Sequence, residues 1–242
     1  MSLSTPIIRL SGINFSYPAS APVLKNLDLT MYPGDRIGLV APNGSGKTTL
    51  FHVIMGLLKP NMGKIEIFGK KIVKEKDFLE VRRRIGLLFQ DADDQLFSPT
   101  VIEDVAFGPL NQGLSEKKAL EKSRKTLEFL GLSGYENRIT FKLSGGEKRL
   151  VSLATVLAMA PEVLLLDEPT TGLDNHTKTK LIQVIESLSI SLIVVSHEFE
   201  FLEAATNKIF TLEDGKVRMD QEVYLHHHEH AHIMGKHPHR HA

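Results

Sequence analysis

Residues 41–48 have the composition of a loop that binds phosphate. Their sequence, Ala-Pro-Asn-Gly-Ser-Gly-Lys-Thr, closely matches the pattern G-x-x-x-x-G-K-[ST]. Gly44 and Gly46 allow successive backbone N–H groups to turn towards a polyphosphate, and a helix that begins here adds partial positive charge. We therefore expect Lys47 to reach the β- and γ-phosphates of a nucleotide and the Thr48 hydroxyl to ligate Mg²⁺.

The first position of this loop departs from the pattern, because Ala41 stands where a glycine is usual. Alanine can occupy that turn if its φ is negative. The alternative interpretation is an ordinary strand–turn–helix with a buried lysine. The rest of the sequence has to decide between the two.

A second group of candidate residues follows the apolar run 163–166, which ends in Asp167 and Glu168. Ligands of parallel sheets bind at the carboxyl ends of the strands, so both acids are expected beside the phosphate loop. Asp167 would hold Mg²⁺ through water, and Glu168 would polarise a water molecule for in-line attack on the γ-phosphate. The alternative is a strand that ends in two surface acids.

A third candidate site is the run Ser144-Gly145-Gly146, which opens a predicted helix to Met159. Exposed N–H groups, the absence of Cβ atoms and a hydroxyl donor suit an anion. Ser-Gly-Gly also occurs in ordinary loops, so this run gains weight only from its position shortly before the two acids.

The elements that must position these residues can be predicted from the pattern of apolar residues. Residues 7–40 alternate apolar and polar side chains, which indicates antiparallel strands that lead into a buried strand at 37–40. A helix is expected at 48–56. Further strands are expected at 63–69 and 85–89.

The second half of the chain combines helices with buried strands. Residues 100–160 are mostly helical, with Ser115 as the N-cap of a helix to Leu130. The apolar runs 163–166 and 192–195 are typical of strands buried on both faces, and an amphipathic helix at 175–188 joins them. Asp214-Gly215 predicts a late hairpin. This order predicts an α/β core that carries a helical subdomain.

Composition narrows the functional class. The chain has 242 residues, 42% hydrophobic and 24% charged, with no net charge and no cysteine. These values predict a globular core without disulfides and give no general attraction to nucleic acid or to an anionic membrane. No apolar stretch approaches the roughly 20 residues of a membrane span. We therefore expect a soluble protein whose membrane role comes through a partner.

The run from Leu143 to Asp174 resembles the segment from signature to D-loop in ATP-binding cassette (ABC) ATPases, and the resemblance extends over about residues 5–220. It implies an α/β fold with a P-loop NTPase (RecA-like) core, an N-terminal antiparallel β-subdomain and an inserted α-helical subdomain at about 91–160. The ABC ATPase domain would span residues 1–225. The implied activity is ATP hydrolysis with Mg²⁺.

The resemblance also assigns residues to roles. Tyr17, which spacing alone leaves equally suited to strand packing, would stack on adenine. Gln90 would contact the metal or the attacking water, and His197, otherwise typical of a structural histidine, would contact the γ-phosphate. The implied catalytic residues are Glu168, His197 and Gln90; the metal ligands are Thr48, Gln90 and Asp167; the nucleotide-binding residues are Tyr17, Ala41, Pro42, Asn43, Gly44, Ser45, Gly46, Lys47, Thr48 and Thr49.

The signature residues would act on a different ATP molecule. They are Leu143, Ser144, Gly145, Gly146 and Glu147, and Asp174 would be the D-loop aspartate. In ABC ATPases the signature meets the nucleotide held by the facing subunit. One cassette in a chain therefore implies a homodimer, or pairing with a second ABC ATPase.

A narrower resemblance comes from residues 90–97 and 105–111, which are similar to ATPase subunits of energy-coupling-factor importers, especially the cobalt and nickel branch. It implies that the helical subdomain docks integral-membrane transport subunits at the cytoplasmic face of the cell membrane. Ala92 stands where proline is common, and Glu198 where aspartate is common.

The segment 226–242 is rich in histidine. Imidazole suits Ni²⁺, Zn²⁺ and Cu²⁺, so these side chains are candidate ligands for Ni²⁺ or Co²⁺, and a purification tag is the alternative. His52 and His176 are expected to be structural or surface residues. The tail histidines are His226, His227, His228, His230, His232, His237, His239 and His241.

The leading hypothesis is an ATP hydrolase that powers import of nickel or cobalt. A second hypothesis keeps the ATPase but assigns a vitamin as cargo, because membrane subunits choose the cargo. A soluble ABC ATPase that acts on DNA or ribosomes is disfavoured, since such proteins carry long coiled coils or two cassettes, and no nucleic acid partner is expected. A further alternative is a protein that buffers metal through its tail. It is disfavoured because it would not explain the complete set of ATPase motifs.

Overall fold

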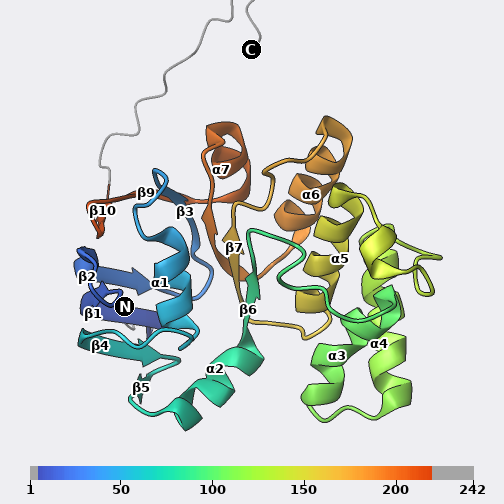
Figure 1. The fold of residues 1–242 in the computed structure, drawn as a ribbon, viewed down its shortest axis with the longest axis horizontal. Coiled ribbons are helices and arrows are strands. Elements are labelled where there is room, and N and C mark those ends of the chain that lie inside the picture. Colours follow the sequence, from blue (N-terminus) through green and yellow to red (C-terminus); the bar gives the residue numbers. More distant parts are fainter. Residues whose placement is uncertain (1–4, 220–242) are drawn as a thin grey trace, which may run out of the picture.

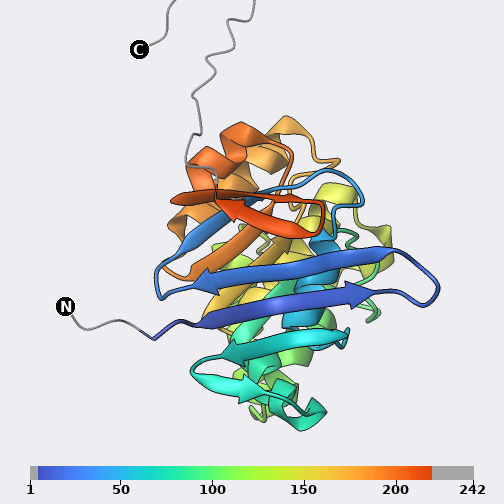
Figure 2. The same ribbon diagram turned by 90° about the vertical axis from the view of Figure 1, so that its left-hand side faces the viewer.

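A computed structural model of the chain describes residues 5–219, which form two sheets and the helices that cover them (Figure 1). The first sheet is antiparallel and has the order β2-β1-β4-β5. Figure 2 shows this sheet with its broad face towards the viewer, in front of the helices. Its strands are β1 (Ile8–Ser16), β2 (Pro22–Met31), β4 (Met62–Ile67) and β5 (Lys70–Ile72).

The second sheet has the order β10-β9-β3-β8-β7-β6, and it is parallel from β9 to β6. Every residue of β7 and β8 is buried, because helices or the first sheet cover both faces, and this explains their uninterrupted apolar runs. The strands are β3 (Arg36–Val40), β6 (Ile85–Leu88), β7 (Val163–Asp167), β8 (Ser191–Val195), β9 (Lys208–Glu213) and β10 (Lys216–Met219).

The helices follow the strands in the order that the sequence predicts for an α/β core with a helical insert. They are α1 (Lys47–Ile54), α2 (Phe78–Arg84), α3 (Val101–Asn111), α4 (Glu116–Phe129), α5 (Gly145–Leu157), α6 (Asn175–Ser187) and α7 (Phe199–Ala205), with 3-10 turns η1 (Glu75–Asp77) and η2 (Thr140–Lys142). The predicted fold class is confirmed. The exact limits of the ATPase domain and of its helical part stay a prediction.

Two apolar clusters lie on opposite faces of the parallel sheet. One joins the antiparallel sheet and α1 to the first face, and the other joins α3 to α7 to the second face. Helix α5 lies very close to β6, since a Cβ on Gly86 would come within 2.2 Å of Val156 Cγ1. The helical insert is therefore anchored to the sheet through α5.

Three elements were not predicted from the sequence: β5, α2 and α7. Both helices have seven residues, and Val81 is the only buried residue of α2. A helix of two turns shows too little of the 3.6-residue period to be detected. The predicted helix after the phosphate loop begins at Lys47, one residue earlier than expected, and ends at Ile54.

Candidate ATP site

The phosphate loop connects β3 to α1 in the conformation that its glycines predict. Gly44 and Gly46 have φ values of 78° and 100°, and Gly46 is the N-cap of α1. A Cβ on Gly46 would lie 2.9 Å from Val23 Cγ1, so a larger residue does not fit. Ala41 is buried and its φ is not positive, which is why alanine is accepted there.

The anion-binding character of the loop is supported by what surrounds the start of α1. The first turn of α1 contains no acidic residue that would offset the positive end of its dipole. The buried Ser45 hydroxyl has no hydrogen-bond partner in residues 5–219. Lys47 is only 7% exposed. These features suit a phosphate group, as predicted from the sequence.

Glu168 joins three distant parts of the chain. Its Oε1 lies 2.7 Å from Lys47 Nζ and 3.0 Å from His197 Nε2, and these two nitrogens are 3.1 Å apart. Lys47 Nζ also donates to Asn43 Oδ1 at 3.3 Å. Because β3, β8 and β7 are neighbouring parallel strands, the segments that follow them meet at one edge of the sheet.

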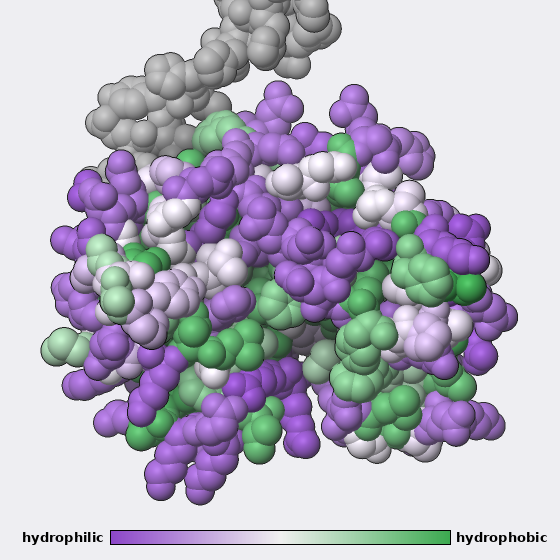
Figure 3. Space-filling view, viewed as in Figure 1, coloured by the Kyte–Doolittle hydropathy of each residue, from purple (hydrophilic) through white to green (hydrophobic). Residues whose placement is uncertain are grey.

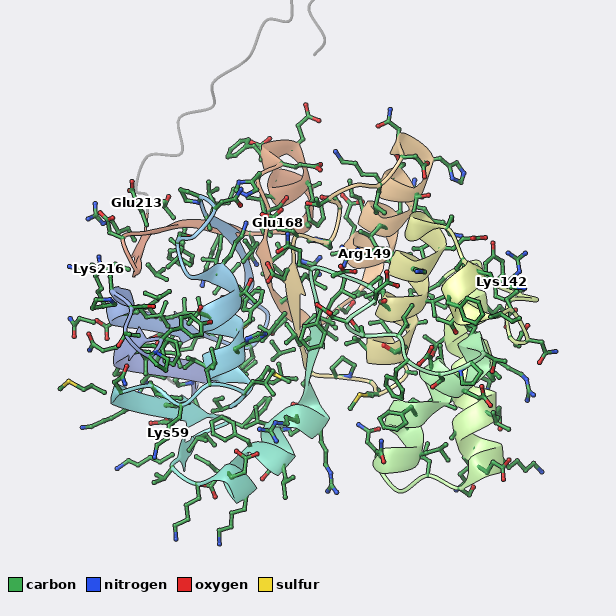
Figure 4. The ribbon with its side chains drawn as sticks, viewed as in Figure 1. Lys59, Lys142, Arg149, Glu168, Glu213 and Lys216 are labelled. Carbon is green, nitrogen blue, oxygen red and sulfur yellow. The ribbon has the colours of Figure 1, made fainter. Side chains whose placement is uncertain are left out.

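The backbone holds Glu168 in this place. Glu168 lies just beyond β7 with a φ of +46°, a left-handed conformation that is rare outside glycine. Its N–H donates to the Val195 carbonyl at 3.0 Å, and its side chain is almost fully buried. Figure 4 labels Glu168 at the carboxyl end of β7. Such local strain is typical of functional positions.

Asp167 and Thr48 form the part of the site that could hold a metal ion. The Thr48 hydroxyl donates to Asp167 Oδ2 at 2.7 Å, whereas the buried Oδ1 has no partner in the described part of the chain. Burial raises the pKa of Asp167, while the Thr48 hydrogen bond and the Lys47 charge act in the opposite direction. Hard oxygen ligands of this kind fit Mg²⁺.

Gln90 lies at a cavity of about 880 Å³ that extends from Thr48 to Gly145 at the start of α5. Its backbone carbonyl accepts a hydrogen bond from Arg149 Nη2, and Arg149 Nη1 donates to the Phe89 carbonyl at 2.6 Å. Arg149 is 5% exposed, and burial lowers its pKa. Figure 4 shows Arg149 on α5.

Arg149 was not among the residues predicted for the site. The signal in the sequence was a cation that opens the apolar run 150–160, where a charge requires a partner. Gln95 supports the same segment: its Nε2 donates to the Ser152 carbonyl at 2.9 Å and its Oε1 accepts from Phe89 N at 3.3 Å. Helix α5 thus holds the segment of Gln90 from two sides.

The predicted signature forms the N-terminus of α5. Ser144 is the N-cap: Ser144 Oγ accepts from Glu147 N at 3.3 Å, and Ser144 N donates to Glu147 Oε2 at 2.8 Å. Glu147 Oε1 also accepts from Tyr135 and Arg138. The hydrogen bond from the Ser144 N–H, followed by that from Tyr135 and by the charge of Arg138, lowers the pKa of Glu147. A Cβ on Gly145 would meet no atom within 4 Å, so the helix end is accessible to an anion.

The remaining predicted residues lie around this centre. Tyr17 is 42% exposed, packs edge-on against Phe15 with 4.9 Å between ring centroids, and its hydroxyl lies 3.2 Å from Thr49 Oγ1. Asp174 caps α6 by accepting from Thr177. His176 is exposed, as expected, whereas His52 lines the cavity.

The structure therefore brings most of the predicted residues together. The phosphate loop, Asp167, Glu168 and His197 form one connected cluster, and Gln90 lies at the cavity beside it. The signature residues 144–147 and the D-loop residue Asp174 have no hydrogen bond or ion pair to this cluster within residues 5–219. The histidines of 226–241 and their predicted metal binding lie outside the described residues, in which no group of three or more His, Cys, Asp or Glu side chains could hold a metal ion.

Comparison with known proteins identifies the family of this chain. The family model for ABC transporters matches residues 24–171, more than half of the chain. The energy-coupling factor transporter ATP-binding protein EcfA of Methanothermobacter thermautotrophicus is 43% identical over 215 residues, which cover 87% of this chain and 69% of that protein.

Two solved structures have the same architecture. One is cbiO1 from Clostridium perfringens, described as part of the ABC transporter complex cbiONQ, with a TM-score of 0.78 and 32% identity over 88% of this chain and 87% of that chain. The other is a dimeric ATP-binding cassette in a post-hydrolysis state bound to ADP and Pi, with a TM-score of 0.79 and 26% identity over 87% and 96% of the two chains. The chain belongs to the ATP-binding subunits of ABC transporters and is an ABC-type ATPase.

Proposed function

We propose that this ATPase powers an importer of the energy-coupling-factor type, and that its cargo is Ni²⁺ or Co²⁺. The observation that carries the importer part is the 43% identity to an energy-coupling factor ATP-binding protein over most of the chain. The eight histidines of the tail, which suit these metals, support the cargo. Similarity to cbiO1 is consistent with both.

In the proposed mechanism, Lys47 changes its partner when ATP binds. Its ammonium group is held by Glu168 at 2.7 Å and is also 3.1 Å from His197. A γ-phosphate would attract Lys47 more strongly than a single carboxylate, since it carries more negative charge. Glu168 would then be free to accept the proton of an attacking water, while His197 contacts the phosphate.

Thr48, Asp167 and Gln90 would hold Mg²⁺ at the same site. When bound, the ion would neutralise charge on the β- and γ-phosphates. Asp167 Oδ1, which has no partner among residues 5–219, and the Thr48 hydroxyl offer oxygen atoms of the required type. Tyr17, beside the first turn of α1, would stack on adenine.

The signature residues would complete the site in a dimer. Ser144 and Gly145 present an accessible helix N-terminus, and no hydrogen bond or ion pair in residues 5–219 joins it to Lys47 of the same chain. We infer that it binds the γ-phosphate held by a facing subunit, with Asp174 near the contact. The dimeric cassette structure that this chain resembles supports this arrangement.

Membrane subunits would dock on the helical part of the molecule. Phe97 is 67% and Phe107 49% exposed, and their rings form an edge-on pair with centroids 4.8 Å apart. Leu110, on the same helix as Phe107, is also exposed. Figure 3 shows hydrophobic side chains gathered over α3 at the lower right. An exposed apolar patch of this kind suits a protein partner at the cytoplasmic face of the membrane.

The proposal is tested by measuring nickel and cobalt in cells that carry the intact chain, the Glu168→Gln variant, or a chain that ends at Leu225. We expect accumulation with the intact chain and none with Glu168→Gln. The shortened chain then shows whether the tail affects flux. Accumulation that does not depend on Glu168 would exclude these metals as the cargo and favour a vitamin, while leaving the ATPase assignment intact.

A further inference from the structure

The charges of this chain are unevenly distributed, although they sum to zero. Residues 59–84 contain nine lysines and arginines against four aspartates and glutamates, a net charge of +5, which leaves −5 for the rest of the chain. The segment forms β4, β5, η1 and α2, which lie together at the lower left of Figure 1. We call the exposed surface of residues 59–84 the basic face.

Several cations of the basic face have no acidic partner among residues 5–219. The acids of the segment are largely occupied: Glu80 pairs with Lys70 and Glu75 with Arg82, both at 2.7 Å, and Asp77 accepts from two backbone N–H groups. The exposed cations without an ion pair in the described chain are Lys59, Lys64, Lys71, Lys74, Lys76 and Arg83.

Aliphatic side chains are interspersed with these cations. Val73 and Leu79 are each more than half exposed, as is Leu57 just before the basic face, and Figure 3 shows hydrophobic residues among hydrophilic ones over this region. The aromatic rings of the face are not free to stack on nucleic-acid bases. Arg84 lies 3.5 Å from the ring centroid of Phe68, and Arg82 lies 5.8 Å from that of Phe78. A mixture of cations and aliphatic groups suits a lipid surface better than a nucleic acid.

A cavity of about 250 Å³ opens on the same face between β5 and α2. Lysines line it together with apolar side chains, which include Ile67, Ile72 and Val81. Asp77 and Glu80 also line it, and both already accept hydrogen bonds from other groups. Positive groups beside an apolar surface match the boundary between phosphate headgroups and acyl chains.

We propose that the basic face binds the anionic surface of the membrane directly. This inference rests on the proposed function, which places the protein at a membrane. Helix α2 and the proposed docking helix α3 both lie towards the lower edge of the molecule in Figure 1, so both could face the same membrane. Lysines near an anionic leaflet are attracted to it, and the −5 charge of the remaining chain is repelled. The contact would therefore orient the subunit, with the basic face towards lipid and the docking helix towards its membrane partner.

The test is co-sedimentation of the full chain with phosphatidylcholine vesicles, with or without phosphatidylglycerol, at pH 8 and low salt. We expect binding only to the anionic vesicles, and weaker binding as salt increases. The triple variant Lys71→Gln, Lys74→Gln, Lys76→Gln should bind roughly a hundredfold more weakly, since each basic residue contributes about a fivefold factor. Its ATPase activity should be unchanged.

The matched control removes the same charge at β2 and β10, away from the basic face, by Lys25→Gln, Lys216→Gln and Arg218→Gln. Figure 4 shows Lys216 at the upper left and Lys59 at the lower left. This control should keep vesicle binding. Equal loss in both triple variants, binding to neutral vesicles, or binding to an oligonucleotide in place of vesicles would overturn the proposal. Because these assays contain no cargo, their outcome is independent of the metal-uptake result.

Discussion

The Asp167 carboxylate is almost fully buried, and only its Oδ2 accepts a hydrogen bond in the described chain. Burial raises its pKa above that of an exposed aspartate. When the folded-state pKa of an acid is raised, its ionised form lowers the free energy of unfolding at pH values above that pKa. This lost stability returns as the pH falls through the folded-state pKa and the acid is protonated. We infer that this residue supplies a metal ligand at the expense of stability.

Asp167→Asn should therefore make the protein more stable and less active. At neutral pH we expect a gain of about 1 kcal/mol in the free energy of unfolding, or about 3 °C in Tm, because a buried charge is removed. The gain should shrink as pH is lowered. ATPase activity should fall about 10- to 100-fold, as for other residues that hold a metal through water. Thermal unfolding and steady-state ATPase assays measure both effects.

Asp104→Asn is the matched control for this substitution. Asp104 is equally buried, but its two oxygens accept hydrogen bonds from Phe97 N, Ser98 N and the Thr140 hydroxyl at 2.9–3.1 Å. Its substitution should lower Tm, since these donors lose a charged acceptor. If Asp167→Asn were destabilising as well, the unpaired-oxygen argument would be wrong.

At this scale, most of the residues that the structure brings together could be predicted from the sequence, because they lie in short runs with strict spacing. Lys47, Glu168 and His197 each follow a predicted strand, and the parallel order of those strands brings them within about 3 Å of one another. Arg149 was not predicted as a site residue. Its hydrogen-bond partners are backbone carbonyls 59 and 60 residues away in the sequence, and such partners leave no pattern in the sequence.

At the scale of elements, Arg149 links α5 to the segment of Gln90. Its guanidinium binds the carbonyls of Phe89 and Gln90 at once, as only a planar group with several donors can do. We infer that it is a positioning residue, which keeps Gln90 at the edge of the cavity when α5 moves. Within the described chain it makes no hydrogen bond or ion pair with residues 41–48.

Arg149→Met should lower kcat about tenfold or more and leave the KM for ATP nearly unchanged, because Gln90 would be displaced while Lys47 remains in place. Arg149→Lys should recover only part of the activity, since lysine cannot bind both carbonyls in the same geometry. Initial rates over a range of ATP concentrations give both constants.

Arg36→Met is the control for loss of stability. Arg36 also binds backbone carbonyls, those of Ala205, Leu188 and Ile185 at 2.6–2.9 Å, but at the start of β3, away from the site. We expect Arg36→Met to lower Tm as much as Arg149→Met does, but with little change in kcat. Equal effects of both substitutions on kcat would show that Arg149 acts only through stability.

Long or fully buried elements were predictable and short ones were not. The runs of β7 and β8 are apolar throughout because both faces are covered, so they stand out in the sequence. Helix α4 was predicted with Ser115 as its N-cap, and Ser115 is its N-cap in the structure. The seven-residue helices α2 and α7 have only about two turns, which is too few to show a helical period in the sequence.

At the scale of the whole molecule, we infer that one connected cluster performs hydrolysis and that ATP closes two chains around it. Lys47, Glu168 and His197 form that cluster, whereas the signature at Ser144 has no link to it within the described chain. The second half of each site would then come from a facing subunit. Such closure would end when the γ-phosphate is cleaved.

The most direct measurement compares the intact chain with Glu168→Gln for ATP binding, ATP turnover and ATP-dependent dimerisation by size-exclusion chromatography. Glu213→Gln, at an exposed position, serves as the control. We predict that Glu168→Gln binds ATP, loses at least about 100-fold in turnover and accumulates as a dimer with ATP. Turnover close to that of the intact chain would show that Glu168 is not the group that activates water.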